Sequence, residues 1–215
     1  MLRRFFNRHK WSLLATVLLI VVLSFNYEQL LSVQYPDSFY IKNFPLLEQP
    51  DQITCGPTSV AMLLQHYGKD TTIQQAKEMA KTEWFSYKDQ VIGMTSPDFI
   101  RVALRRFGVQ AQMQRTTLPH LKYYISQSRP PVVLVRSSDK TWHYVVAIGY
   151  DEKKIYLADP AWGKVRAVSI DQFERAWNFT SDLRGSDFGK LDYWKLAVET
   201  SDVRGYTLIV PTDKP

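Results

Sequence analysis

Apolar residues recur at helical spacing in the first half of the chain. The clearest run lies between Cys55 and Gly68, where intervals of three and four residues place the apolar side chains on one helical face. These side chains belong to Val60, Ala61, Leu63, Leu64 and Tyr67. Pro57 falls in the first turn, where its missing amide hydrogen costs no hydrogen bond, and Gly68 can end the helix in a left-handed conformation. The pattern predicts a helix that begins at Cys55.

Residues typical of helix ends predict further helices. Thr72 and Gln75 have the spacing of a capping box, and Ser96 is an N-cap before a proline, with Gly108 as the stop signal. The further helices are expected over about residues 73–81, 97–107, 118–128 and 170–177.

Short apolar runs in the second half of the chain predict strands. They cover residues 131–136, 142–150, 154–159, 164–169 and 206–210, after a first short strand near 39–41. The charged turn of residues 151–153 predicts a hairpin. Because most helices precede the strands instead of alternating with them, the pattern indicates an α+β fold with an antiparallel sheet.

The N-terminus has a different pattern. Residues 1–10 contain four basic residues and no acid, and residues 11–27 contain no charge at all. A bilayer is crossed by about 17 to 25 apolar residues, so we expect a single-pass signal anchor in the cell membrane. A cleaved signal peptide is the alternative, although no Ala-x-Ala pattern marks a cleavage point. The basic flank should stay in the cytoplasm, which makes everything after the anchor extracytoplasmic.

These segments divide the chain into a basic flank (1–10), a transmembrane helix (11–27), a tether (28–38) and one folded domain (39–215). The net charge is +6, but four of those charges lie in the flank. From residue 11 onward, 23 basic residues face 21 acidic ones. A nucleic-acid groove would need a cationic cluster in the folded part, so we expect no nucleic-acid partner.

Cys55 is the only cysteine in the chain. A disulfide within the monomer and a zinc site built on several thiolates are therefore excluded, and we expect neither a metal nor a cofactor. A buried cysteine that packs as a small apolar residue is the structural alternative.

The position of Cys55 favours nucleophilic chemistry. The thiolate is the attacking form of a cysteine, and both a helix N-terminus and a neighbouring imidazolium stabilise it. His143, in an apolar predicted strand, is the best candidate for that imidazole. His9 is on the basic flank, His66 is near the far end of the helix of Cys55, and His120 should be solvated. A core histidine bonded to a backbone carbonyl is the other interpretation of His143.

Hairpin geometry suggests a third member of the catalytic group, beside Cys55 and His143. If residues 151–153 form a three-residue loop, His143 opposes Ala161 and Asp159 is its diagonal neighbour on the same face. A four-residue loop would send Asp159 to the other face unless a bulge restored the register. With that register, Asp159 could hold the imidazole in the tautomer that accepts the thiol proton. An Asp-Pro turn residue is the alternative for Asp159.

Acyl transfer also needs hydrogen-bond donors for the developing oxyanion. The backbone N–H of Cys55 is one candidate, and the side-chain amides of Gln49 and Gln52 are two more. We favour Gln49, because the turn-forming Pro50-Asp51 pair can bring it back across the helix mouth.

The segments EQPDQITCGPTSVAMLLQHYG and WHYVVAIGYDEKKIYLADPAWG resemble the C39-like peptidase family, a papain-fold group related to bacteriocin-leader peptidases. The similarity covers about residues 40–178 and includes GMTSPDF, RPPVVLV and SIDQFERAW. It implies a papain-like fold, with Cys55 as nucleophile, His143 as base, Asp159 as orienting acid and Gln49 as oxyanion donor.

The chain departs from the leader peptidases at two positions. Those enzymes usually have an acid before the cysteine and a second cysteine soon after it, where this chain has Thr54 and Ser59. Processing of double-glycine leaders is therefore not implied. No recognised motif covers residues 179–215, where Trp194 and the run from Tyr206 could form extra strands or part of a substrate lip.

We therefore expect an extracytoplasmic, membrane-anchored cysteine peptidase that hydrolyses a peptide or protein substrate through Cys55, His143 and Asp159. Two alternatives remain. A thiol transpeptidase would use an amine in place of water at the thioester, and an inactive papain-like module would bind peptides without cutting them.

Overall fold

The structure is a computed structural model, and it describes residues 34–87, 90–138, 141–179 and 205–215 of the chain. Residues 35–215 form one compact unit. The predicted anchor at 11–27 lies outside the described residues. Within the described ranges, no helix is long and apolar enough to cross a membrane.

The helices predicted from the sequence are confirmed in the described domain. They are α2 (Cys55–His66), α3 (Ile73–Met79), α4 (Pro97–Arg106), α5 (Leu118–Ser126) and α6 (Ile170–Trp177). Thr72 and Gln75 close the expected capping box at the start of α3. Gly68 and Gly108 follow α2 and α4 with positive φ angles of 67° and 83°, which are conformations that glycine adopts without a steric penalty.

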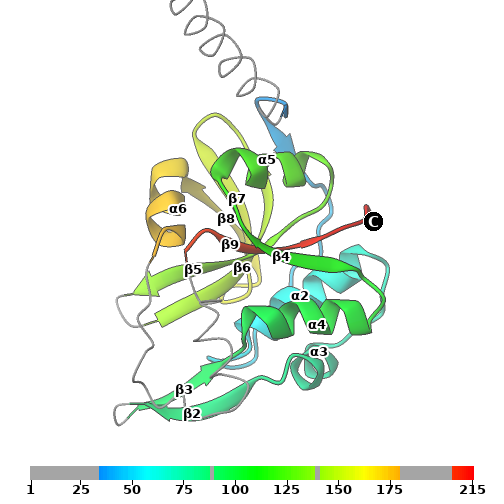
Figure 1. The fold of residues 1–215 in the computed structure, drawn as a ribbon, viewed down its shortest axis with the longest axis vertical. Coiled ribbons are helices and arrows are strands. Elements are labelled where there is room, and N and C mark those ends of the chain that lie inside the picture. The colour runs from blue at the N-terminus through cyan, green and yellow to red at the C-terminus, as the bar shows by residue number, and fades with distance from the viewer. Residues whose placement is uncertain (1–33, 88–89, 139–140, 180–204) are drawn as a thin grey trace, which may run out of the picture. The chain divides into compact units, whose positions relative to one another are not determined.

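Within the described residues, the domain has an antiparallel sheet of seven strands. Six of them are in the order β4-β9-β5-β6-β7-β8, and β1 pairs with β6. The strands are β1 (Phe39–Tyr40), β4 (Ala111–Arg115), β5 (Val132–Ser138), β6 (Thr141–Tyr150), β7 (Lys154–Asp159), β8 (Lys164–Ser169) and β9 (Thr207–Pro211). The C-terminal strand β9 therefore lies inside the sheet, between β4 and β5 (Figure 1).

The expected order of helices first and strands later was wrong in one respect. The hairpin of β2 (Glu83–Tyr87) and β3 (Gln90–Met94) and the edge strand β4 occur between the helices. The sequence of β4, AQMQR, contains only two apolar residues, and only Ala111 is buried in this edge strand. It pairs with β9, which is distant in the sequence.

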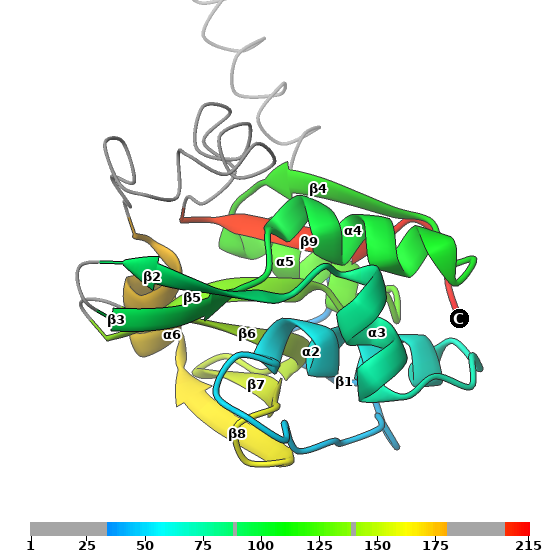
Figure 2. The ribbon, with the colours of Figure 1, turned by 90° about the horizontal axis from the view of Figure 1, so that it is seen from below.

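Helices α2, α3 and α4 pack against one another, and α2 also contacts β6. Helix α6 lies apart from this group and contacts β5, β7 and β8 (Figures 1 and 2). The residues between Gly56 and Leu64 of α2 are all buried, so this helix is a central part of the core. Its first residue nevertheless remains partly accessible.

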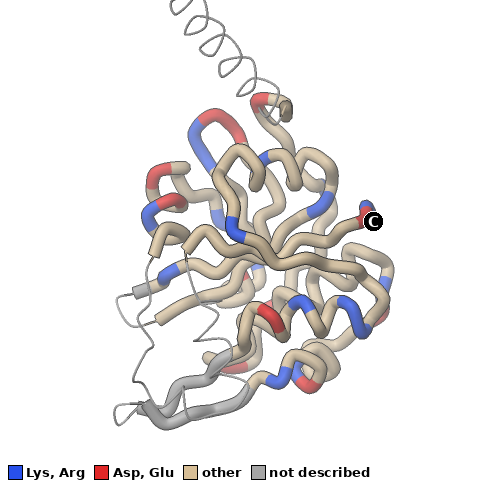
Figure 3. Tube along the Cα trace, viewed as in Figure 1, with Lys and Arg blue, Asp and Glu red and all other residues tan. Residues whose placement is uncertain are grey.

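Charged residues of both signs are interspersed over the described domain (Figure 3). The hairpin loop of residues 151–154 and helix α6 each carry acidic positions next to basic ones.

The loop between β6 and β7 differs from the expected one. Tyr150 pairs with Ile155, so four residues instead of three lie between the last paired residues of the two strands. A bulge between Ala147 and Gly149 then shifts the register by one residue, and Ala147 pairs with Leu157. The bulge restores the side-chain parity that a three-residue loop would have produced.

Candidate active site

Cys55 is the first residue of α2, and its thiol is free and half-buried. The preceding residue, Thr54, makes no side-chain capping hydrogen bond to the helix. The N-terminal end of a helix presents N–H groups and a partial positive charge, so the thiol lies where a negative charge is stabilised. Gly56 permits close packing here, since a Cβ atom would lie 3.0 Å from both Ile100 Cδ1 and Thr95 Oγ1.

His143 lies near the start of β6, on the same face of the sheet as Asp159 at the end of β7. The Nε2 atom of His143 is 2.6 Å from Oδ1 of Asp159. The side chain of Cys55 is near enough to help raise the pKa of the His143 imidazole. Since Nε2 is engaged by Asp159, Nδ1 is the ring nitrogen that remains for the thiol. The structure thus brings together the three residues that the sequence analysis singled out.

Asp159 is 1% exposed and makes several hydrogen bonds. Oδ1 also accepts a hydrogen bond from the Ala161 backbone N–H, at 3.0 Å. Oδ2 accepts one from Nη1 of Arg166, at 2.7 Å. A buried carboxylate needs such partners to remain ionised, and both oxygens of Asp159 have them.

Arg166 was not predicted as part of the site. It lies on β8 directly opposite Leu157 and therefore diagonally from Asp159. Its sequence context, KVRAVS, is that of an ordinary solvent-facing strand. Only the pairing register of β7 with β8 could have indicated this contact from the sequence.

The pKa of His143 is raised to about 9. Burial of the ring opposes its protonation, but hydrogen bonds to Asp159 and Cys55, together with the charges of these two groups, outweigh burial. Burial likewise opposes ionisation of Asp159, yet the hydrogen bond and charge of His143, followed by the Arg166 hydrogen bond, hold the pKa of this carboxyl below its ordinary value. An imidazolium facing an ionised carboxylate is therefore the favoured state of the pair.

Gln49 is held in the turn that leads into α2. Its backbone N–H donates to the Pro160 carbonyl at 2.8 Å, which ties this turn to the residue after Asp159. Its Nε2 donates to the Asp51 carbonyl at 2.6 Å, and this contact fixes the orientation of the amide. Each amide nitrogen has two hydrogens, so one N–H remains for another acceptor. Gln52, the other candidate, is exposed.

The remaining described histidines lie elsewhere. His66 ends α2, opposite to Cys55, and packs on Phe44 with ring centroids 5.1 Å apart. His120, in α5, has Nδ1 3.0 Å from Thr117 Oγ1. Across the described ranges, no group of three or more His, Cys, Asp and Glu side chains could hold a metal ion.

The antiparallel sheet, the buried helix that begins at a cysteine and the paired histidine and aspartate define an α+β domain with a candidate thiol site. Residues 41–184 match the Peptidase_C39 like family, and the chain belongs to that family. The resemblance drawn from the sequence motifs is thereby confirmed.

Several characterised proteins are similar to this chain. The Lactococcin-G-processing and transport ATP-binding protein LagD of Lactococcus lactis subsp. lactis is 29% identical over 142 residues, which is 61% of this chain and 17% of LagD. The transport/processing ATP-binding protein ComA of Streptococcus pneumoniae R6 is 31% identical over 134 residues, with 60% and 17% covered. The chain therefore spans less than a fifth of the length of these relatives.

Two solved structures share the fold. The peptidase domain of Streptococcus ComA has a TM-score of 0.57 at 20% identity, covering 80% of this chain and 100% of that domain. A C39-like peptidase of Bacillus anthracis also has a TM-score of 0.57, at 16% identity, with 84% and 100% covered.

Proposed function

We propose that this chain is a cysteine peptidase that hydrolyses peptide bonds, with Cys55 as nucleophile, His143 as base and Asp159 as the acid that orients the ring. The observation that carries the proposal is the 2.6 Å contact between His143 and Asp159, together with a cysteine at the start of a buried helix whose side chain helps to raise the pKa of His143. Membership of the C39-like family supports the same chemistry.

The proposed reaction begins with transfer of the thiol proton of Cys55 to Nδ1 of His143. The raised pKa of His143, about 9, favours the imidazolium that results. The thiolate attacks the carbonyl carbon of the scissile bond, and the backbone N–H of Cys55 and the free N–H of Gln49 Nε2 stabilise the oxyanion. His143 then donates its proton to the leaving amine as the C–N bond breaks.

The thioester that remains on Cys55 is hydrolysed in the second half of the reaction. His143, now neutral, takes a proton from a water molecule that attacks the thioester carbonyl, and it returns the proton to the thiolate as the C–S bond breaks. Throughout the cycle, Asp159 stays ionised and keeps Nδ1 directed at the sulfur.

The proposed location is the outer side of the cell membrane, with residues 11–27 as the anchor. This part of the proposal rests on the basic flank and the uncharged apolar run. The proposed substrate is a peptide or an extended segment of a protein. LagD and ComA are named for processing, but Thr54 and Ser59 distinguish this chain from the leader peptidases, so the proposal does not extend to double-glycine leaders.

Cleavage of a pool of random-sequence peptides, measured by mass spectrometry, tests the proposal. The wild-type chain should release new N-termini, and Cys55→Ala should release none. The melting temperature should be nearly unchanged, because one small side chain replaces another. Conversion mainly to products joined to an added amine, with little hydrolysis, would indicate a transpeptidase. Peptides that bind the wild-type chain and remain uncut would favour the binding module and contradict the proposal.

A further inference from the structure

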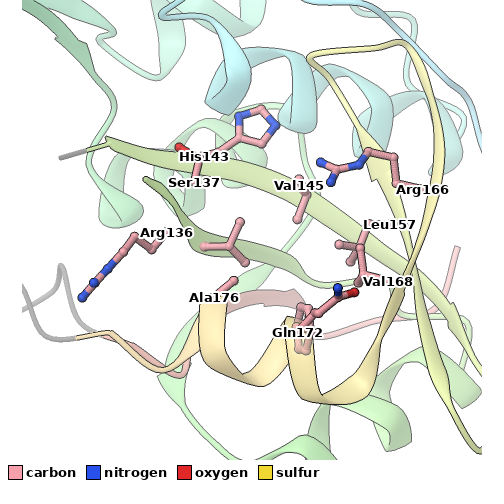
Figure 4. A pocket seen from close by; sticks show the side chains of 11 residues that line it. Arg136, Ser137, His143, Val145, Leu157, Arg166, Val168, Gln172 and Ala176 are labelled. Carbon is pink, nitrogen blue, oxygen red and sulfur yellow. The ribbon is translucent and has the colours of Figure 1, made fainter. Parts of the chain in front are cut away.

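A cavity of about 300 Å³ lies between the sheet and helix α6 and reaches the candidate site (Figure 4). Its wall is apolar and is formed by Val135, Val145, Leu157, Val168, Phe173 and Ala176. Its rim is polar, with His143 and Arg166 at one end and Gln172 of α6 at the other (Figure 4). The site described above assigns no role to this cavity.

The chemistry of acyl transfer determines which part of a substrate lies next to this cavity. The leaving amine must take its proton from the imidazole, so the leaving segment lies on the His143 side of the nucleophile. Because His143 itself lines the cavity, the first side chain of the leaving segment has the shortest path into it.

The cavity has the dimensions and polarity for one large apolar side chain. Pockets that bind whole small molecules begin at about 300 Å³, so this cavity suits a single side chain better than a peptide segment. Arg166 is held to Asp159 by Nη1, and its side chain is 47% exposed at the rim. A polar rim over an apolar wall matches a residue whose backbone stays in solvent while its side chain is buried.

We propose that the cavity is the subsite for the first residue of the leaving segment and that it selects a large apolar side chain such as that of Leu or Phe. The inference rests on the proposed peptidase function, because the direction of the leaving segment follows from the role of His143.

This selection can be measured directly from how an acyl-enzyme divides between reaction with water and reaction with an added amine. Cys55 of the full-length chain is acylated with p-nitrophenyl acetate, and the thioester is then offered water together with leucinamide, phenylalaninamide or glycinamide. The amine attacks the thioester carbonyl, an amide forms and the thiol is released, so the ratio of amide to acetate reports binding of the amine. Leucinamide and phenylalaninamide should exceed glycinamide by about tenfold or more, as burial of a large apolar side chain predicts.

Two variants of the cavity wall and one control sharpen the test. Ala176→Leu fills the cavity and should remove most of the preference for leucinamide over glycinamide. Val168→Ala enlarges it and should favour phenylalaninamide over leucinamide. Arg175→Leu changes the same helix at an exposed residue that does not line the cavity, and it should keep the wild-type ratios. Equal partition of all three amines in the wild type would overturn the subsite.

A binding measurement separates failure of the subsite from failure of the proposed function. If Cys55 is never acylated, the proposed function fails. The subsite is then tested with the Cys55→Ala chain labelled in its alanine and valine methyl groups. Leu-Ser amide should produce saturable NMR shifts at Val168 and Ala176, whereas Gly-Ser amide should bind at least about tenfold more weakly. The absence of saturable shifts with Leu-Ser amide would overturn the inference.

Discussion

At the scale of single residues, the hydrogen bonds of Asp159 hold the side chains of the candidate site in place. One oxygen faces His143 and the other faces Arg166. The sequence could identify Cys55 and His143 from a helix start and an apolar strand, and it could identify Asp159 given a register. It could not identify Arg166, because that contact depends on the pairing of β7 with β8. The catalytic roles of these residues remain predictions.

Removal of Arg166 should change the pH dependence of peptide cleavage. Arg166 helps to hold the pKa of Asp159 below its ordinary value, so in Arg166→Met the carboxyl should be protonated at higher pH. The acidic limb of the kcat profile should therefore move to higher pH. Arg166→Lys keeps the charge without the planar fork and should restore part of the shift. Unchanged acidic limbs in both variants would show that Arg166 has no positioning role.

Gln49 and Gln52 should differ strongly when each is replaced. Gln49 is fixed at the turn before α2 with one amide N–H remaining, whereas Gln52 is exposed. Loss of an oxyanion donor lowers kcat by about 100- to 1000-fold, and Gln49→Ala should show that loss while Cys55 still reacts with small electrophiles. Gln52→Ala is the matched control and should lower kcat only slightly. The reverse ranking, or two mild variants, would mean that the oxyanion site lies elsewhere.

At the scale of secondary-structure elements, the sequence predicted the helices well because capping residues and glycine stops are local signals. The hairpin of β2 and β3 and the edge strand β4 were missed, since β4 carries only two apolar residues and its partner β9 is distant in the sequence. The turn of residues 151–153 lies where it was expected, but Tyr150 pairs with Ile155 and not with Lys154. The bulge in β6 corrected the register, and a bulge leaves little trace in a run of small and β-branched residues.

Gly149 adjoins this bulge and allows β1 to approach β6. A Cβ atom at position 149 would lie 2.6 Å from Tyr40 Cδ2 and 3.0 Å from the Phe39 carbonyl oxygen. Gly149→Ala should therefore lower the free energy of unfolding by about 1–3 kcal/mol, measured by urea denaturation. In the background of Tyr40→Ala, which removes the nearer atom, the same substitution should lower the free energy of unfolding by a smaller amount. An equal cost in both backgrounds would show that the ring of Tyr40 is not the obstacle.

At the scale of the whole molecule, we expect the N-terminal segments to determine the side of the membrane on which the domain lies. Residues 1–27 lie outside the described part of the structure, and the expected topology rests on their charge pattern. Protease added to spheroplasts should digest the domain, while a cytoplasmic marker protein remains intact. Protection of the domain in intact spheroplasts would contradict the expected topology. A soluble form that lacks about the first 30 residues would instead indicate a cleaved signal peptide.

The pH dependence of Cys55 alkylation tests the central claim most directly. The chain has one cysteine, so iodoacetamide reports on Cys55 alone and no substrate is needed. The raised pKa of His143 places a positive charge beside the sulfur between pH 6 and pH 8. The wild-type rate should therefore fall less steeply from pH 8 to pH 6 than the rate of His143→Gln, which lacks the imidazolium. A wild-type rate that falls as steeply as that of the variant would contradict the pairing of Cys55 with His143.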